Sequence, residues 1–320
     1  MRTRFRASMI AVGIAVVAVG AAISLSVSRT AGQGSRPARI GDSPNFSGIW
    51  QANNEAHWDL QAHAARPGMV TQPGVYPYAY ARVPAAPVLA LGAAGGVPGS
   101  IGVVQGDKQI PYLPEALAIK NENAEHWIDR DPELKCYLPG IPRATYMPYP
   151  FEITQSTNKI HMSYEFANAA RTIHLDEVEP PPTDLWMGHS VGRWEGDTLV
   201  VDVTDFNDKT WFDRAGNHHS DGLKVVERFT LMTPDVIRYD VTIEDPATFT
   251  RSWQISMPLY RRLEPNMQLI EYRCTEFVEE FLYGNIRREQ LVKRWEGETI
   301  IIDVTRKIPP EDEFYEWYRK

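Results

Sequence analysis

Residues 186–229 decide the fold, and they read WMGHSVGRWEGDTLVVDVTDFNDKTWFDRAGNHHSDGLKVVERF. Glu195-Gly196-Asp197 separates two extended runs in this stretch. Glycine reaches positive φ at little cost and aspartate can hydrogen-bond its own backbone, so these residues favour a tight turn. The run Thr198–Thr204 is largely β-branched, and Leu223–Phe229 is another extended run that follows a polar loop. The stretch therefore predicts antiparallel strands that carry polar and titratable side chains.

Strand-like runs separated by turn residues continue through most of the chain after residue 150. We predict strands at 151–155, 159–166, 171–176, 189–194, 198–205, 223–230, 236–243, 250–259 and 268–274, with an earlier strand near 46–51. Regular spacing of short strands is typical of a meander that closes on itself. The expected fold is all-β with minor helix, an antiparallel meander that closes into a calycin- or lipocalin-like β-barrel with its core at 136–275.

The segments outside this core are expected to be irregular or partly helical. Residues 33–135 are rich in Pro and Gly, and 66–115 is interpreted as an extended loop over the body of the protein or as a disordered insertion. Helical spacing predicts a short helix at 114–129. Residues 276–320 are expected to add a helix, a charged tail and a hairpin, because 292–305 repeats the pattern of 191–204.

The first residues have the pattern of an export signal. Three arginines, Arg2, Arg4 and Arg6, precede the apolar run Met9–Val27, and small residues follow it. This pattern predicts a signal peptide at 1–32 and a periplasmic or secreted protein. The apolar run is also long enough for a single uncleaved membrane anchor, which stays open as the alternative.

Composition limits the partners. The net charge of −8 and a pI near 5.6 argue against nucleic acid, which needs a concentrated basic face. The 9 Trp and 14 Tyr favour cavities for apolar or sugar-like ligands. Zinc-type Cys/His spacing is absent from the sequence, and we expect no metal and no cofactor. The two cysteines, Cys136 and Cys274, are predicted to form one disulfide in an oxidising compartment, with two buried thiols as the alternative.

Strand alternation places charged side chains inside the predicted barrel. Glu227 shares the apolar face of its strand, and Arg171 shares the face of Ile173. Asp205 falls on the inner side at the end of its strand. A buried charge is costly unless it is paired, so Arg171 is expected to pair with Glu227 or with Asp205. Such a pair fixes strand register in a small barrel or lines a ligand cavity in a wider one.

The polar loop at 211–221 and the strand before it add further candidates. They are Trp194, Trp211, Asp213, His218, His219 and Ser220, with His189 at the start of the preceding strand. One interpretation is that His219 or Ser220 caps the loop by hydrogen bonding to the backbone. Another is acid–base catalysis, with His219 or Asp213 as general base and Arg171 stabilising an anion. Metal binding by the histidines is a third.

Several short segments of the sequence resemble segments of a large family of exported bacterial proteins of unassigned function. They are GIPR at 140–143, PYPFEITQ at 148–155, GHSVGRWEGDTLVVDVTDFNDKTWFD at 188–213, His219-Ser220, Glu227-Arg228, TIEDP at 242–246 and EYRC at 271–274. The resemblance covers about the central half of the chain and implies an exported, lipocalin-like β-protein with no established reaction. The chain departs from the family after Asp176, where EVEPPPTD replaces a histidine-containing loop.

These observations lead to three functional hypotheses. The first is a barrel that holds a small apolar or amphipathic ligand in its interior, with Arg171, Glu227 and Asp205 as polar anchors. The second is a cofactor-independent lyase, isomerase or hydrolase that uses the same cavity. The third is an envelope protein-interaction module that uses the Pro-rich segment 66–115.

Overall fold

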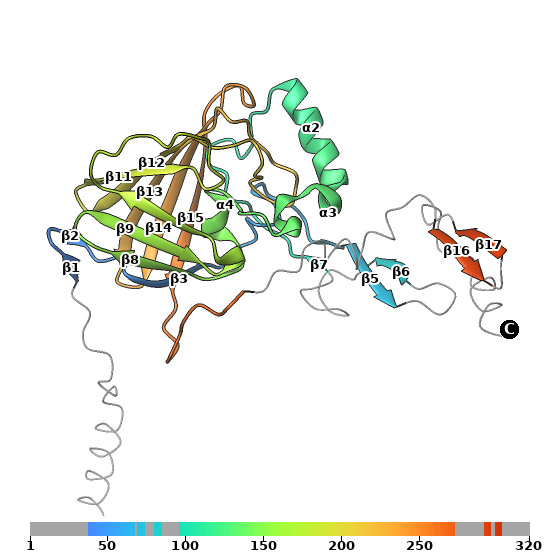
Figure 1. Cartoon of the computed structure of the whole chain (residues 1–320), viewed down its shortest axis with the longest axis horizontal. Coiled ribbons are helices and arrows are strands. Elements are labelled where there is room, and N and C mark those ends of the chain that lie inside the picture. Colours follow the sequence, from blue (N-terminus) through green and yellow to red (C-terminus); the bar gives the residue numbers. More distant parts are fainter. Residues whose placement is uncertain are drawn as a thin grey trace, which may run out of the picture. The chain divides into compact units, whose positions relative to one another are not determined.

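The computed structural model describes residues 38–67, 69–73, 80–84, 96–272, 291–295 and 298–302. Nine of the described strands form a closed barrel, in the order β10-β11-β12-β13-β14-β15-β3-β8-β9 around its wall (Figure 1). Their bounds are β3 Gly48–Ala52, β8 Phe151–Gln155, β9 Lys159–Tyr164, β10 Ala170–His174, β11 His189–Glu195, β12 Thr198–Thr204, β13 Lys224–Thr233, β14 Val236–Glu244 and β15 Trp253–Arg261. The prediction of an all-β, calycin-like barrel is confirmed.

Tight antiparallel hairpins make up much of the wall. β11 ends at Glu195 and β12 begins at Thr198, so the turn lies where the sequence predicts it. Gly196 has a φ of 61° in this turn, a conformation that glycine adopts without a Cβ clash. β13 pairs with β12 on one side and β14 on the other, which fixes both strands by ladder hydrogen bonds.

A strand from the N-terminal segment completes the wall. β3 pairs with β15 through Trp50↔Arg261 and with β8 through Trp50↔Phe151. The barrel thus includes a strand from outside the core expected at 136–275. The strand expected at 268–274 is wrong over its described part, because residues 268–272 have no strand conformation. β3 already occupies the edge of β15 that a further strand would have needed.

The barrel closes with a parallel pair, which a pure meander would not contain. β10 and β11 run parallel, and only Ile173↔Ser190 and His174↔Val191 are in register between them. We call this junction the β10–β11 seam. Parallel strands need a connection that returns along their whole length, and residues 175–188 with their three prolines supply it. Every other neighbouring pair of the described barrel strands is antiparallel.

Short helices and an extended segment lie beside the barrel. The helices are α2 Pro114–Glu125, α3 Trp127–Arg130, η2 Pro132–Lys135, α4 Arg143–Tyr146 and η3 Phe166–Asn168, and α2 and α3 confirm the helix predicted at 114–129. α2 packs closely on the loop at 211–221, since a Cβ on Gly216 would come within 2.6 Å of the Ala124 nitrogen. Val104 forms a bridge with Ile255 of β15, so this part of the 66–115 segment lies along the barrel as expected.

Four small sheets account for the other described strands. They pair β1 Arg39–Ile40 with β2 Ser43–Pro44, β4 Arg66–Pro67 with β7 Gly96–Val97, β5 Met69–Pro73 with β6 Tyr80–Pro84, and β16 Leu291–Trp295 with β17 Glu298–Ile302. The last pair confirms the hairpin expected from the internal repeat. The β5–β6 hairpin was not expected in a segment that reads as loop.

Several expectations concern residues outside the described ranges. They are the signal peptide or anchor at 1–32, the helix at 275–290, the charged tail and Cys274. The Cys136–Cys274 disulfide therefore stays a prediction. Within the residues that the structure covers, no helix combines the length and the apolar character of a membrane span.

Candidate functional site

An ion pair between Arg171 and Glu227 lies inside the barrel. Arg171 is on β10 and Glu227 is on β13, and both point inward with the apolar residues of their strands. Nη1 of Arg171 lies 2.6 Å from Oε2 of Glu227, and Nη2 lies 3.0 Å from Oε1, so the contact is bidentate. The side chains are 2% and 0% exposed. The structure thus selects Glu227 over Asp205 as the partner of Arg171.

Four other side chains, Tyr239, Ser190, Met162 and Tyr164, interact with the pair and complete what we call the interior cluster. The hydroxyl of Tyr239 donates to Oε1 of Glu227 at 2.6 Å. Nη1 of Arg171 donates to Oγ of Ser190 at 3.4 Å, and Nη2 lies 3.3 Å from Sδ of Met162. Nε of Arg171 is buried and has no hydrogen-bond partner within the described residues. One donor of the cluster is therefore still unused.

Electrostatics keep Arg171 charged in this apolar setting. Burial acts to lower the pKa of Arg171, but the attraction of Glu227, its hydrogen bonds and the nearby Tyr164 and Tyr239 together outweigh burial, and the net pKa is raised. Burial raises the pKa of Tyr239 well above its ordinary value, and the negative charge of Glu227 adds to that effect. Tyr239 therefore stays a neutral hydrogen-bond donor across the physiological range.

The side chains around the interior cluster are closely packed. Trp50, Phe151, Phe229 and Tyr239 are each 0% or 1% exposed, and the rings of Phe229 and Tyr239 lie 4.8 Å apart. A void that holds a water molecule would leave part of its lining exposed, so these side chains fill the space between them. A ligand next to the pair has to displace side chains, and the unbranched Met162 beside Arg171 is the one best suited to move.

Asp205 does not belong to the interior cluster, and the expectation of an inward carboxylate is wrong. β12 ends at Thr204, and Asp205 adopts a φ of 56°, which interrupts the alternation of the strand. Its Oδ2 accepts a hydrogen bond of 2.6 Å from Oγ1 of Thr204, and its carbonyl accepts from the backbone nitrogen of Leu185. Asp205 therefore helps to join the end of β12 to the segment around Leu185, which runs parallel to it.

His219 holds its loop in place. Its Nδ1 lies 2.8 Å from the carbonyl oxygen of Ser220, so Nδ1 carries the proton and donates. Its Nε2 then accepts from the hydroxyl of Thr210 at 2.7 Å. Burial lowers the pKa of His219, which favours this neutral form. Both ring nitrogens thus bond within the loop, Nδ1 to the Ser220 carbonyl and Nε2 to the Thr210 hydroxyl, and the loop-capping interpretation agrees with this geometry.

Asp213 also organises this loop from the inside. Its carboxylate accepts hydrogen bonds from the backbone nitrogens of Leu60 at 2.8 Å and Ala215 at 2.9 Å, and from Nδ2 of Asn217 at 2.7 Å. Burial, followed by the charge of Asp59, raises the pKa of Asp213 to about 7. Within the described residues neither Asp213 nor His219 contacts Arg171, so the structure does not assemble the predicted catalytic group.

The remaining predicted residues occupy separate places. Ser220 donates from its nitrogen and from Oγ to the carboxylate of Asp245, at 2.7 and 2.8 Å. His189 points outward from β11 while Ser190 points inward, so these neighbours lie on opposite faces of the wall. Trp194 stacks on Phe46 with ring centres 5.5 Å apart, and Trp211 is 8% exposed in a bridge to His218.

A second buried charge cluster, which we call the end network, was missed by the sequence analysis. Arg143 contacts Oδ1 of Asp131 and Oε2 of Glu133, both at 2.7 Å. Arg214 binds Glu133 at 2.9 and 3.0 Å, and Nε2 of His57 lies 3.2 Å from the same carboxylate. The network draws together segments that are far apart in sequence. A contact between such distant segments cannot be predicted from the local sequence pattern. The segment GIPR at 140–143, which resembles the exported family, does contain Arg143.

Charge balance explains how the end network tolerates burial. Burial acts to raise the pKa of Glu133, but Arg214 and the other cations outweigh it, and the net pKa is held well below its ordinary value. Burial lowers the pKa of His57, so this ring stays neutral beside two arginines and two carboxylates. The guanidinium of Arg214 also lies 4.8 Å from the ring centre of Trp58 and 5.2 Å from that of Trp127.

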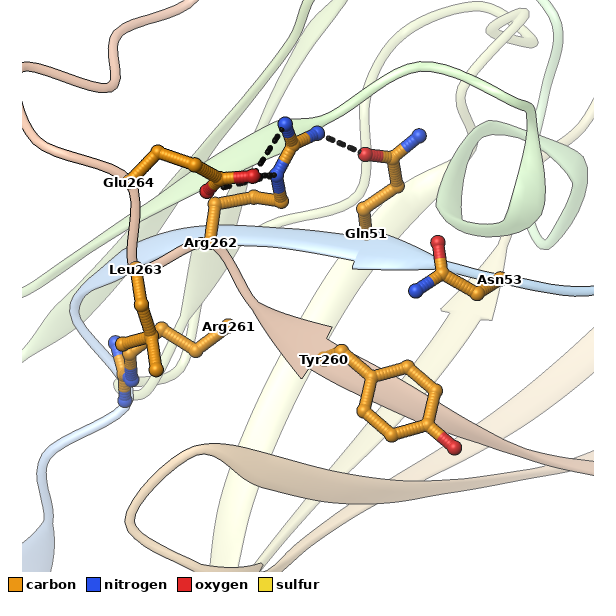
Figure 2. A pocket seen from close by; sticks show the side chains of 7 residues that line it. All are labelled: Gln51, Asn53, Tyr260, Arg261, Arg262, Leu263 and Glu264. Atoms are coloured by element: carbon orange, nitrogen blue, oxygen red, sulfur yellow. Dashed lines mark hydrogen bonds and ion pairs between the residues drawn. The ribbon is translucent and has the colours of Figure 1, made fainter.

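An open groove of about 690 Å³ lies on the outer wall, where β3 and β15 end (Figure 2). It is lined by Gln51, Asn53, Tyr260, Arg261, Arg262, Leu263 and Glu264. Arg262 is neutralised within the groove by Glu264 at 2.8 Å and bonds to the amide of Gln51. The groove shares no lining residue with the interior cluster.

Similarity to known proteins adds nothing to this description of the site. Comparisons with protein-family models, with curated proteins and with solved structures return no match to this chain.

Proposed function

We propose that this chain is an exported β-barrel protein that binds a small, largely apolar ligand in the barrel interior. The ligand presents one hydrogen-bond acceptor to Arg171, and the aromatic and aliphatic side chains of the wall enclose its apolar part. The observation that carries the proposal is the interior cluster: a fully enclosed, bidentate ion pair in an apolar barrel, with one buried guanidinium donor still unused.

Stability alone gives little reason for such a pair. Replacing a buried ion pair by apolar residues of similar volume is often neutral or stabilising, so a barrel that only needed a filled core would do as well without it. Ladder hydrogen bonds hold β13 on both sides and hold β10 along β9, with two further register pairs between β10 and β11. These ladders supply most of what positions the two strands.

The β10–β11 seam offers a route to the cluster. Only two residue pairs join these strands, and Arg171 and Ser190 lie directly inside the junction. Short parallel pairing is among the less stable arrangements of a sheet. Opening of this seam, with displacement of Met162, would admit a ligand next to the unused donor of Arg171.

Replacing the whole pair separates ligand binding from stability. The variant that combines Arg171→Met and Glu227→Leu removes both charges, so its free energy of unfolding is expected to equal that of the wild type or to exceed it by about 1–4 kcal/mol. We expect it to lose the small molecules that co-purify with wild-type protein from its native envelope, as measured by mass spectrometry of organic extracts.

The matched control is the outer-face pair Arg193–Asp202, with the changes Arg193→Gln and Asp202→Asn. This control is expected to keep the wild-type extract profile. The proposal is wrong if the folded Met/Leu variant carries the same co-purifying molecules in the same amount as wild type. It is equally wrong if wild-type protein carries none and binds no apolar probe, such as 1-anilinonaphthalene-8-sulfonate.

A further inference from the structure

Two histidines meet on the outer side of the β10–β11 seam. Ile173 and Ser190, the register pair at the seam, point inward and are 0% and 2% exposed. Because side chains alternate along a strand, their neighbours His174 and His189 point outward. The two imidazole rings stack across the seam, with centres 5.8 Å apart and planes inclined by 27°.

Among the residues that the structure describes, none forms a side-chain hydrogen bond with either ring. The structure gives His174 and His189 no hydrogen-bond partner within the described residues, apart from their contact with each other. Nε2 of His189 is shielded from solvent and is unpartnered there. A buried nitrogen without a partner costs free energy, so a group that binds it would stabilise this arrangement.

The geometry points to a divalent transition-metal ion held by these two rings, and we propose a Cu²⁺, Zn²⁺ or Ni²⁺ site at His174 and His189. Metal–nitrogen bonds of ~2.0–2.1 Å to one tetrahedral ion place the two ring centres about 5 Å apart. The observed 5.8 Å is close to that separation, but the rings stack with planes inclined by 27°, so ion binding requires both rings to turn until one nitrogen of each points at the ion. No motif spacing relates the two histidines, so the site depends on the closure of the barrel, which brings β10 beside β11.

The neighbouring groups decide which ions fit and how tightly. Imidazole ligands suit copper, zinc and nickel, whereas calcium and magnesium prefer oxygen ligands. No third His, Cys, Asp or Glu in the described part of the chain completes a metal-binding group here, so water fills the other positions. Lys159 lies opposite His174 on β9, and Thr204 lies opposite His189 on β12. The positive charge of Lys159 weakens binding of a cation, so the ion is exchangeable. Among the divalent ions, Cu²⁺ binds nitrogen ligands most tightly.

A bound ion would join β10 to β11 where the fewest residue pairs connect the wall. It would thereby stabilise the closed barrel and oppose opening of the seam. This inference does not rest on the proposed interior ligand, because it uses only side chains on the outer face.

Copper titration of the full-length protein tests the site. Protein stripped with EDTA is titrated with Cu²⁺ at pH 7.5 by calorimetry, and electron paramagnetic resonance reports how many imidazole nitrogens bind the ion. We expect one site with two nitrogens. His174→Phe and His189→Phe keep a ring at each position but remove a metal ligand. Each should weaken copper binding by about tenfold or more, because even removing a group that only hydrogen-bonds to a metal ligand costs about tenfold.

His161 provides the matched control, because it is an exposed histidine on the neighbouring strand β9 and contacts Thr172 instead. His161→Phe should leave the copper affinity and the spectrum unchanged. Zn²⁺ should raise the melting temperature of wild type and of this control, but not of the two seam variants. Equal copper binding in wild type and both seam variants would overturn the proposal, as would an equal loss in His161→Phe. If a Phe variant does not fold, the corresponding His→Asn variant repeats the test.

Discussion

Arg143 and Arg171 are both almost fully enclosed, with side-chain exposures of 1% and 2%, but they join different kinds of structure. Arg143 connects two carboxylates in an irregular segment, and through Glu133 it reaches Arg214 and His57. Arg171 connects two strands of one sheet: β13 has ladder hydrogen bonds on both sides, and β10 has a ladder with β9 and two register pairs with β11. The end network therefore holds loops that have no ladder, whereas the interior pair adds a polar group to a wall that is already in place.

The comparison teaches that burial and charge alone do not identify a functional site. Both clusters are buried and ionic, but only the interior cluster is dispensable for positioning its own backbone. A substitution in the end network should cost more stability than one in the interior cluster. Removing one member leaves its charged partners buried without a counter-charge, in loops that have few other contacts to hold them. The following predictions test this difference.

Arg143→Met is expected to have the largest effect. It leaves Asp131 without its bidentate partner and Glu133 with only Arg214 and His57, so the free energy of unfolding should fall by about 5 kcal/mol, the upper end of the cost of breaking a buried pair. Urea unfolding followed by tryptophan fluorescence measures the loss. A loss below that of Glu227→Gln would reverse the proposed order of the two clusters.

Glu227→Gln should cost less, about 3 kcal/mol, because the guanidinium of Arg171 keeps an amide oxygen as acceptor while losing the opposite charge. The same urea experiment gives the value. The double variant Arg171→Met with Glu227→Leu should recover most of this loss. If the double variant is less stable than Glu227→Gln, the pair is a structural requirement of the barrel.

The free energy of unfolding should depend on pH near neutrality, because of the Asp213 carboxyl. Its pKa of about 7 in the folded state lies above its ordinary value of 3.8. Between pH 3.8 and pH 7 the folded state therefore binds more protons than the unfolded state. The free energy of unfolding should therefore fall as pH rises from 5 to 7, by at most ~1.4 kcal/mol per pH unit from this group. Asp213→Asn should remove that slope, measured by urea unfolding at three pH values. A carboxyl ¹³C titration midpoint below 5 would contradict the prediction.

Asp202→Asn should have the smallest effect and sets the baseline for the others. Its pair with Arg193 lies on the outer face, and the side chains are 51% and 47% exposed for Arg193 and Asp202. Exposed pairs of this kind contribute about 0.2–1 kcal/mol. A thermal unfolding scan at low and at high salt checks both the size and the salt dependence of the loss. A loss as large as that of Glu227→Gln would mean that burial does not separate the two pairs.

The strands could be predicted because their signals are local. β8 matches its expected bounds, Phe151–Gln155, and the turn at Gly196 lies where the sequence indicates. The inward direction of Arg171 and Glu227 followed from alternation alone. Asp205 was misplaced because a positive φ at the end of its strand is not visible in a hydrophobic pattern. His219 was recognised as a candidate, but only its two hydrogen bonds show that it has no free nitrogen.

Local sequence patterns are enough to predict the all-β class, the hairpin turns and the faces of the strands, because period-two alternation and turn chemistry act over a few residues. Tertiary packing was needed to show that β3 completes the wall, that the barrel closes with a parallel pair, and that Glu133 brings Arg143, Arg214 and His57 together. It also brought His174 against His189. These contacts depend on which strand edges and loops meet after the chain has closed, and that choice is made by packing over the whole barrel.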